Sequence, residues 1–220
     1  MRYVSLGDSS AVGVGAERGG GYPARLAARL RRAGLEVEHR NVGASGAMAV
    51  DVATTQAPQA ARLQPALVTI GVGGNDLWQR TSVAELSRSL RDTLQALALV
   101  EHVDVFVLNV PDLSLAPIAA LAGHYVQITP QQGAARVDAF NAAIADVVNR
   151  VDAEARATGA DRHHVVVDLC GPSRREAVNN PELFASDGFH PSARGYERYT
   201  DLLWPAVVDA LHRRGHVLAG

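Results

Sequence analysis

Apolar residues follow two different periods along the chain, and the two periods alternate. Short, nearly unbroken apolar runs at residues 3–6, 66–72, 103–108 and 165–169 are typical of strands in a parallel sheet that is covered on both faces. Residues 35–39 alternate apolar and polar side chains, which predicts a strand nearer the edge of the sheet. Between these runs, apolar residues recur every three or four positions, as they do in amphipathic helices.

Signals that start or end helices flank the helical stretches. Ser82 and Glu85 form a capping box, and Thr129 is a cap followed by proline in the first turn. We expect a helix over residues 22–34, one from residue 82, one from 130 to about 159, one after 191 with a kink at Pro205, and a short segment interrupted near Pro58.

This alternation of strands and helices predicts an α/β fold, namely a three-layer α/β/α sandwich around a parallel sheet of about five strands. The 220 residues suit one domain spanning residues 1–220, since no linker or internal repeat interrupts the pattern. Ligands bind at the carboxyl edge of such sheets. The loops that follow the first, second, third and fifth strands can therefore converge on one site.

Composition removes several functional classes. All 21 basic residues are arginine, so there is no lysine for a Schiff base, a phosphate-binding loop or a Ser–Lys dyad. The net charge is −2 and the arginines are scattered, which argues against a nucleic-acid partner. No apolar run approaches the roughly 20 residues of a membrane span, and no secretory leader precedes the first strand. We expect no stable membrane insertion and a cytoplasmic location, and the oligomeric state stays open.

The sulfur and imidazole groups indicate neither a disulfide nor a metal site. Cys170 is the only cysteine and follows an apolar run, so we expect a buried, unreactive thiol. His163-His164 enters a predicted strand without a nearby cluster of carboxylates, and we interpret the pair as structural.

Three residues could form a nucleophilic site. Ser9 follows the first strand, where its hydroxyl would lie at the carboxyl edge of the sheet. Asp187 precedes His190 by three residues with a glycine between them, so a tight turn can direct the carboxylate onto the imidazole. His190 could then take the proton of Ser9. The alternative, a helix-capping aspartate beside a surface histidine, is the commoner meaning of the Asp-His spacing taken alone.

Acyl transfer also needs donors for an oxyanion. The backbone N–H groups of Ser9 and Gly43 and the side-chain amide of Asn75 follow three predicted strands and could supply them. For Gly43 and Asn75 taken singly, a purely structural turn is the commoner explanation, and their positions directly after adjacent central strands favour the functional one. Two rival motifs are incomplete: Ser45 lacks the last glycine of a nucleophile elbow, and residues 13–18 lack the third glycine of a dinucleotide fingerprint.

Four separated blocks together resemble the GDSL esterase/lipase family of SGNH hydrolases. They are Gly7-Asp8-Ser9-Ser10, with Ser10 where the family usually has leucine, Gly43 within residues 41–46, Gly73-Gly74-Asn75-Asp76, and Asp187-Gly188-Phe189-His190-Pro191. The resemblance covers nearly the whole chain. It implies Ser9 as nucleophile, His190 as base, Asp187 as its partner, and Ser9, Gly43 and Asn75 as the oxyanion hole. It also implies a flavodoxin-like strand order of 2-1-3-4-5, with no metal and no cofactor.

The resulting expectation is a serine ester hydrolase that acts through an acyl-enzyme on a small-molecule ester with a short to medium acyl chain. An acyl-CoA thioesterase or lysophospholipase and a sugar O-deacetylase are alternatives on the same site, and a non-catalytic binding domain is the alternative from another class. The apolar residues of the 113–126 segment could line an acyl pocket, form a lid or simply cover the core; they are Leu113, Leu115, Ile118, Leu121, Tyr125 and Val126.

Overall fold

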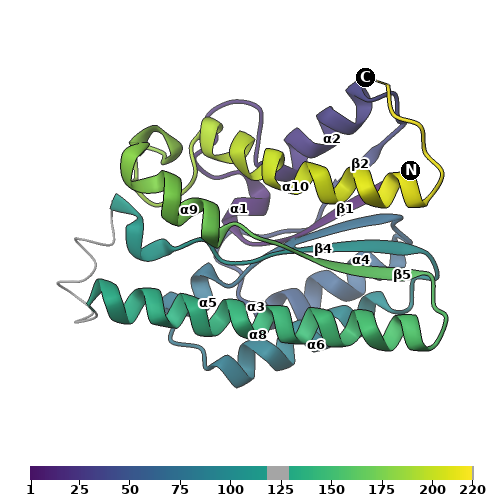
Figure 1. Ribbon diagram of the computed structural model, residues 1–220, viewed down its shortest axis with the longest axis horizontal. Helices are drawn as coiled ribbons and strands as arrows, with labels where there is room; N and C mark the ends of the chain where they lie inside the picture. The colour runs from purple at the N-terminus through teal and green to yellow at the C-terminus, as the bar shows by residue number, and fades with distance from the viewer. Residues whose placement is uncertain (118–128, 220) are drawn as a thin grey trace.

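The computed structural model describes residues 1–117 and 129–219, and its centre is a five-stranded parallel sheet (Figure 1). The strand order is β2-β1-β3-β4-β5, which is the predicted 2-1-3-4-5 order. The strands are β1 (Arg2–Gly7), β2 (Glu38–Asn41), β3 (Leu67–Gly71), β4 (Val103–Leu108) and β5 (Arg162–Val167). All neighbouring strands run parallel, so their carboxyl ends meet at one edge.

Helices cover both faces of the sheet, which makes the predicted three layers (Figure 1). One layer holds α1 (Ser9–Val12), α2 (Tyr22–Arg32), α9 (Cys170–Glu176) and α10 (Ala193–Arg213). The other holds α3 (Ala49–Asp51), α4 (Ala57–Arg62), α5 (Gly74–Trp78), α6 (Val83–Leu97) and α8 (Pro130–Ala157). The helices of each layer pack their apolar faces onto the sheet, which gives one hydrophobic core on each side of it.

The capping signals place the starts of two long helices correctly. Ser82 and Glu85 form the reciprocal capping box of α6. Thr129 caps α8 through the backbone N–H of Gln132, with proline in the first turn. The helical segment is irregular near Pro58, as predicted, and Pro58 itself lies in the first turn of α4. The irregularity there is a π-helical turn just before it, Val52–Gln56.

The two edge strands begin at residues other than those predicted. β2 begins at Glu38, three residues after the predicted start, and β5 begins at Arg162, three residues before it. At β5, backbone pairing with β4 runs from Arg162 to Val167, so polar residues outside the apolar run join the ladder. An edge strand is held by hydrogen bonds to one neighbour only, and its side chains are partly exposed to solvent, so polar residues are tolerated there.

A close approach of two glycines shapes the carboxyl edge. Gly7 pairs with Gly71 at the ends of β1 and β3. At the φ of Gly7, +138°, a Cβ atom would lie 2.1 Å from the carbonyl oxygen of Gly71, so only glycine fits. The two loops that follow, one with Ser9 and one with Asn75, therefore leave the sheet side by side.

Three short turns complete the described chain, one after β4 and two between α9 and α10. They are η2 (Leu113–Leu115), η3 (Ala177–Asn179) and η4 (Pro181–Leu183). Within the two described stretches, no helix combines the length and apolar character needed to cross a membrane.

Candidate active site

Ser9, His190 and Asp187 form a hydrogen-bonded chain. Ser9 is the first residue of α1 and is only 8% exposed. Its Oγ lies 3.0 Å from Nε2 of His190, and Nδ1 of His190 lies 2.6 Å from Oδ2 of Asp187. The structure therefore brings the three predicted side chains together, with the His190 ring bonded to both of the others. With the Nδ1 proton directed at Asp187, Nε2 is left to accept the hydroxyl proton of Ser9.

A tight turn holds Asp187 in place. Its Oδ1 accepts hydrogen bonds from the backbone N–H groups of Phe189 and His190, both at 2.9 Å. Partial burial alone would raise the pKa of Asp187, but the bond from the His190 ring and these two backbone bonds lower it overall. The carboxylate therefore stays ionised at neutral pH and orients the imidazole.

Asp8 fixes the local backbone at Ser9, a role that sequence reasoning missed. Its Oδ1 accepts from the backbone N–H and the hydroxyl of Ser10, at 2.9 and 2.8 Å. Burial raises the pKa of Asp8, and the bonds from Ser10 offset part of that rise. An acidic side chain directly before a helix start is a capping signal that could have revealed this role.

One hydrogen of the Asn75 side-chain amide is already in a hydrogen bond. Its Nδ2 donates to the carbonyl oxygen of Ala47 at 2.9 Å, which orients the side chain and leaves the second amide hydrogen unassigned. The backbone N–H of Ser9 has no acceptor among the described residues. Two of the three predicted oxyanion donors are thus available.

Gly43, the third predicted donor, is already bonded. Its backbone N–H donates to Oδ1 of Asn41 at 2.9 Å, and the amide of Asn41 in turn donates to the carbonyl oxygen of Ala11 at 2.7 Å. In this conformation the asparagine two residues earlier makes a side-chain turn that competes for this N–H, and the role of Gly43 as an oxyanion donor stays a prediction.

Other N–H groups of the same loop are available. In the described part of the chain, neither Ser45 nor Gly46 has an acceptor for its backbone N–H. Gly46 has a φ of +82° and open space around it, and it directly precedes Ala47, whose carbonyl Asn75 holds.

A cavity of about 70 Å³ opens between the catalytic candidates. Ser9, Asn75 and His190 all line it, together with residues from the loops after β4 and β5. Phe189 lies edge-on to the His190 ring, with 4.9 Å between the ring centroids. Sequence reasoning did not single out Phe189, Leu169 or Tyr199 as lining residues, since their apolar character is equally typical of core.

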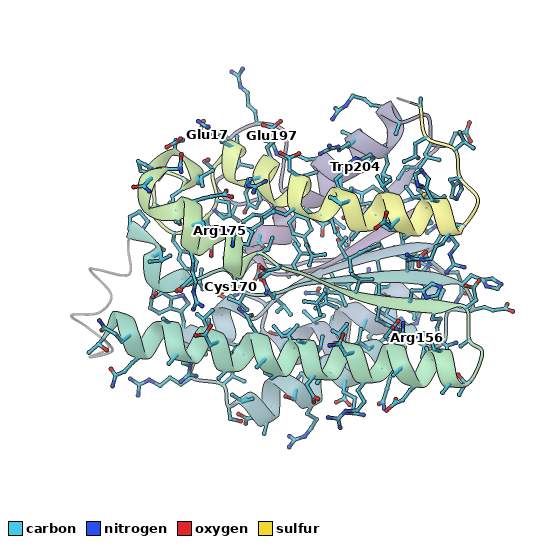
Figure 2. The ribbon with its side chains drawn as sticks, viewed as in Figure 1. Glu17, Arg156, Cys170, Arg175, Glu197 and Trp204 are labelled. Atoms are coloured by element: carbon cyan, nitrogen blue, oxygen red, sulfur yellow. The ribbon has the colours of Figure 1, made fainter. Side chains whose placement is uncertain are left out.

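The remaining candidates do not join this site. Ser45 is exposed on its loop, and no group of three metal-ligating side chains occurs in the described residues. Cys170 lies at the start of α9, where Figure 2 labels it, and burial raises the pKa of its thiol, as expected for an unreactive cysteine. Leu113 lines the cavity, whereas Ile118, Leu121, Tyr125 and Val126 lie outside the described residues.

The sequence matches one known protein family over most of its length. The profile of the GDSL-like lipase/acylhydrolase family matches residues 5–198. The chain belongs to this family. Membership of this family indicates that the protein is an ester hydrolase. A comparison with curated protein sequences gives no significant match.

Solved structures with the same fold are distant in sequence. TesA is 22% identical with a TM-score of 0.71, over 96% of this chain and 100% of that one. A family 3 carbohydrate esterase from Clostridium thermocellum is 21% identical with a TM-score of 0.72, over 98% and 99%. A lipase/acylhydrolase from Enterococcus faecalis is 21% identical with a TM-score of 0.68, over 100% and 98%. These likenesses establish the shared α/β/α architecture.

Proposed function

We propose that this GDSL-like protein is a serine esterase that works through an acyl-enzyme, with residues 1–220 acting as one hydrolase domain. The observation that carries the proposal is the chain from Asp187 through His190 to Ser9, which ends in a cavity also lined by Asn75. A serine hydroxyl becomes a useful nucleophile only beside such an oriented base.

The reaction has two halves. Ser9 Oγ attacks the ester carbonyl while His190 Nε2 takes its proton, and the tetrahedral intermediate collapses when His190 returns that proton to the leaving alcohol. Water then attacks the acyl-Ser9 ester, again giving its proton to His190, and the acid leaves as Ser9 regains its hydrogen. Asp187 stays ionised throughout and stabilises the imidazolium.

Three donors would stabilise the oxyanion in each half. They are the backbone N–H of Ser9, the free amide hydrogen of Asn75 and the backbone N–H of Gly43, which the Asn41 side chain must first release. Each such donor is worth about 10²–10³ in kcat in serine hydrolases.

Hydrolysis of p-nitrophenyl acetate tests the proposal. Because each variant removes a triad member, Ser9→Ala and His190→Ala should lower kcat by roughly 10³–10⁶-fold. Ser45→Ala is a matched control, since it removes another serine hydroxyl near the same edge, and its kcat should equal that of the wild type. A fluorophosphonate should label the wild type and fail to label Ser9→Ala.

Two results would contradict the proposal. Undiminished turnover by a folded Ser9→Ala protein would exclude Ser9 as the nucleophile. A wild-type protein that neither hydrolyses esters nor reacts with the fluorophosphonate would favour a non-catalytic binding domain.

A further inference from the structure

A second cavity of about 60 Å³ lies between α9, the η3 and η4 turns and the first half of α10. Most of its lining is apolar. The residues that line it but not the first cavity include Pro172, Ala177, Leu183, Phe184 and Leu202. The reaction scheme above gives this space no role.

The second cavity adjoins the first. Both are lined by the same six residues, which form a shared wall: Pro111, Leu113, Leu169, Phe189, Pro191 and Tyr199. Phe189 and Pro191 flank the proposed base His190 in sequence, and the Leu113 side chain lies against Gly74, beside Asn75. These six residues therefore lie between the reacting atoms and the second cavity.

The charged side chains of the second cavity are paired with one another. Arg198 donates two hydrogen bonds to Glu176, at 2.7 and 2.6 Å, and Arg174 donates to Asp112 at 2.6 Å. The Ser173 hydroxyl accepts from the backbone N–H of Asp112 and donates to the carbonyl oxygen of Cys170. Polar groups satisfied in this way do not select a charged ligand, so the space suits hydrocarbon.

We propose that the second cavity binds the distal part of a medium-length acyl chain whose carbonyl is held at Ser9. The inference rests on the proposed function and adds its substrate class. Each cavity has room for roughly four to six water-sized or methylene-sized groups. Acetyl and butyryl groups then fill only the first cavity, whereas an octanoyl group is long enough to reach the second if its chain passes between the side chains of the shared wall.

The acyl side of the ester fits this cavity better than the alcohol side. The acyl group stays bonded to Ser9 through both halves of the reaction, while the alcohol must leave so that water can enter. A hydrocarbon cavity beside the nucleophile therefore suits the acyl group, which stays bonded to Ser9. Each methylene buried there contributes to transition-state binding, which sets the preference for chain length.

Filling the cavity tests this assignment. Ala177 is 8% exposed and lines only the second cavity, so Ala177→Leu should occupy it. With p-nitrophenyl octanoate and p-nitrophenyl acetate, the leaving group is constant and the ratio of the two kcat/KM values reports the acyl chain alone. This ratio should fall about tenfold or more, the usual effect of lost methylene contacts in an apolar pocket.

A matched control is Ala155→Leu, at a 6% exposed alanine of α8 that lines neither cavity. It adds the same bulk to a buried site and should leave the ratio unchanged. Leu202→Ala, which enlarges the second cavity, should move the preference towards longer chains such as decanoate, and it keeps the test decisive if Ala177→Leu does not fold.

The two proposals fail differently. If Ser9-dependent acetate hydrolysis persists and neither cavity variant changes the chain-length ratio, the acyl-site assignment is wrong and the esterase proposal stands. A preference that changes with alcohol length instead, measured with ethyl and octyl acetate, would assign the cavity to the leaving group and overturn the inference. If no ester is hydrolysed in a Ser9-dependent way, the proposed function itself is wrong.

Discussion

A single glycine determines where the proposed base can lie. Gly15, in the loop after α1, has a φ of +84°. A Cβ atom there would lie 2.9 Å from the carbonyl oxygen of Pro191 and 3.0 Å from Cβ of His190. Contacts this short force the neighbouring segment to move, so Gly15 keeps the histidine turn close to Ser9.

We expect Gly15→Ala to lower kcat for p-nitrophenyl acetate by roughly 10²-fold, because a displacement of about 1 Å between reacting groups costs that much. Gly215→Ala is a control with nearly the same backbone strain, since Gly215 has a φ of +79° and nothing within 4 Å. Equal kcat values for the two variants would mean that the contact with His190 does not position the base.

The sequence predicted the geometry of the candidate triad better than the hydrogen bonding of the candidate oxyanion donors. Ser9, Asp187 and His190 act through side chains, and their spacing within motifs follows from turn geometry. A backbone N–H is available only if no nearby acceptor takes it, and Asn41 takes that of Gly43. The asparagine two residues before Gly43 is the signal that could have shown this, because asparagine side chains often bond the backbone two residues later.

Among the elements, α8 anchors the loop that follows β4. The Asn141 side chain accepts from the backbone N–H of Val110 and donates to its carbonyl oxygen, both at 2.8 Å. Val110 is 3% exposed and lines the first cavity. One side chain from the helix layer therefore satisfies both backbone groups of a residue that shapes the candidate site.

Asn141→Ala should lower the free energy of unfolding by about 2 kcal/mol, because two backbone groups of a buried residue lose their partner. Urea denaturation measures this change. Asn149→Ala makes the same substitution at an exposed position of α8 and should change stability by less than about 0.5 kcal/mol. If the two variants were equally stable, the bonds to Val110 would contribute nothing.

Helix starts and central strands were predictable, and edge strands were not. Capping boxes and first-turn prolines are local signals, so Ser82 and Thr129 marked α6 and α8 correctly. The buried strand β4 coincides with its apolar run at residues 103–108. β2 and β5 depend on pairing with a distant partner, and the polar residues Arg162 and His163 join β5 because β4 offers a free edge.

Across the whole molecule, folding buries titratable side chains on both sides of the sheet. Burial, reinforced by Arg31, lowers the pKa of His39 to about 4, and its ring stacks on Tyr3 with 4.5 Å between centroids. Burial also lowers the pKa of His164, which is 5% exposed in β5. Both histidines are thus neutral in the folded protein at pH values where the unfolded chain, with an ordinary histidine pKa of about 6.5, already protonates.

Acid should therefore destabilise the fold before the carboxylates titrate. Between about pH 6.5 and 4 the unfolded state binds more protons than the folded state, so the stability present above pH 6.5 is lost as the pH falls. The share of His39 is on the order of 1–3 kcal/mol, the lower end allowing for solvent at the edge strand. His39→Gln should reduce the loss in unfolding free energy between pH 7.5 and 4.5 by that amount, whereas His212→Gln, at an exposed histidine, should not. Identical pH profiles for the two variants would show that His39 is not responsible.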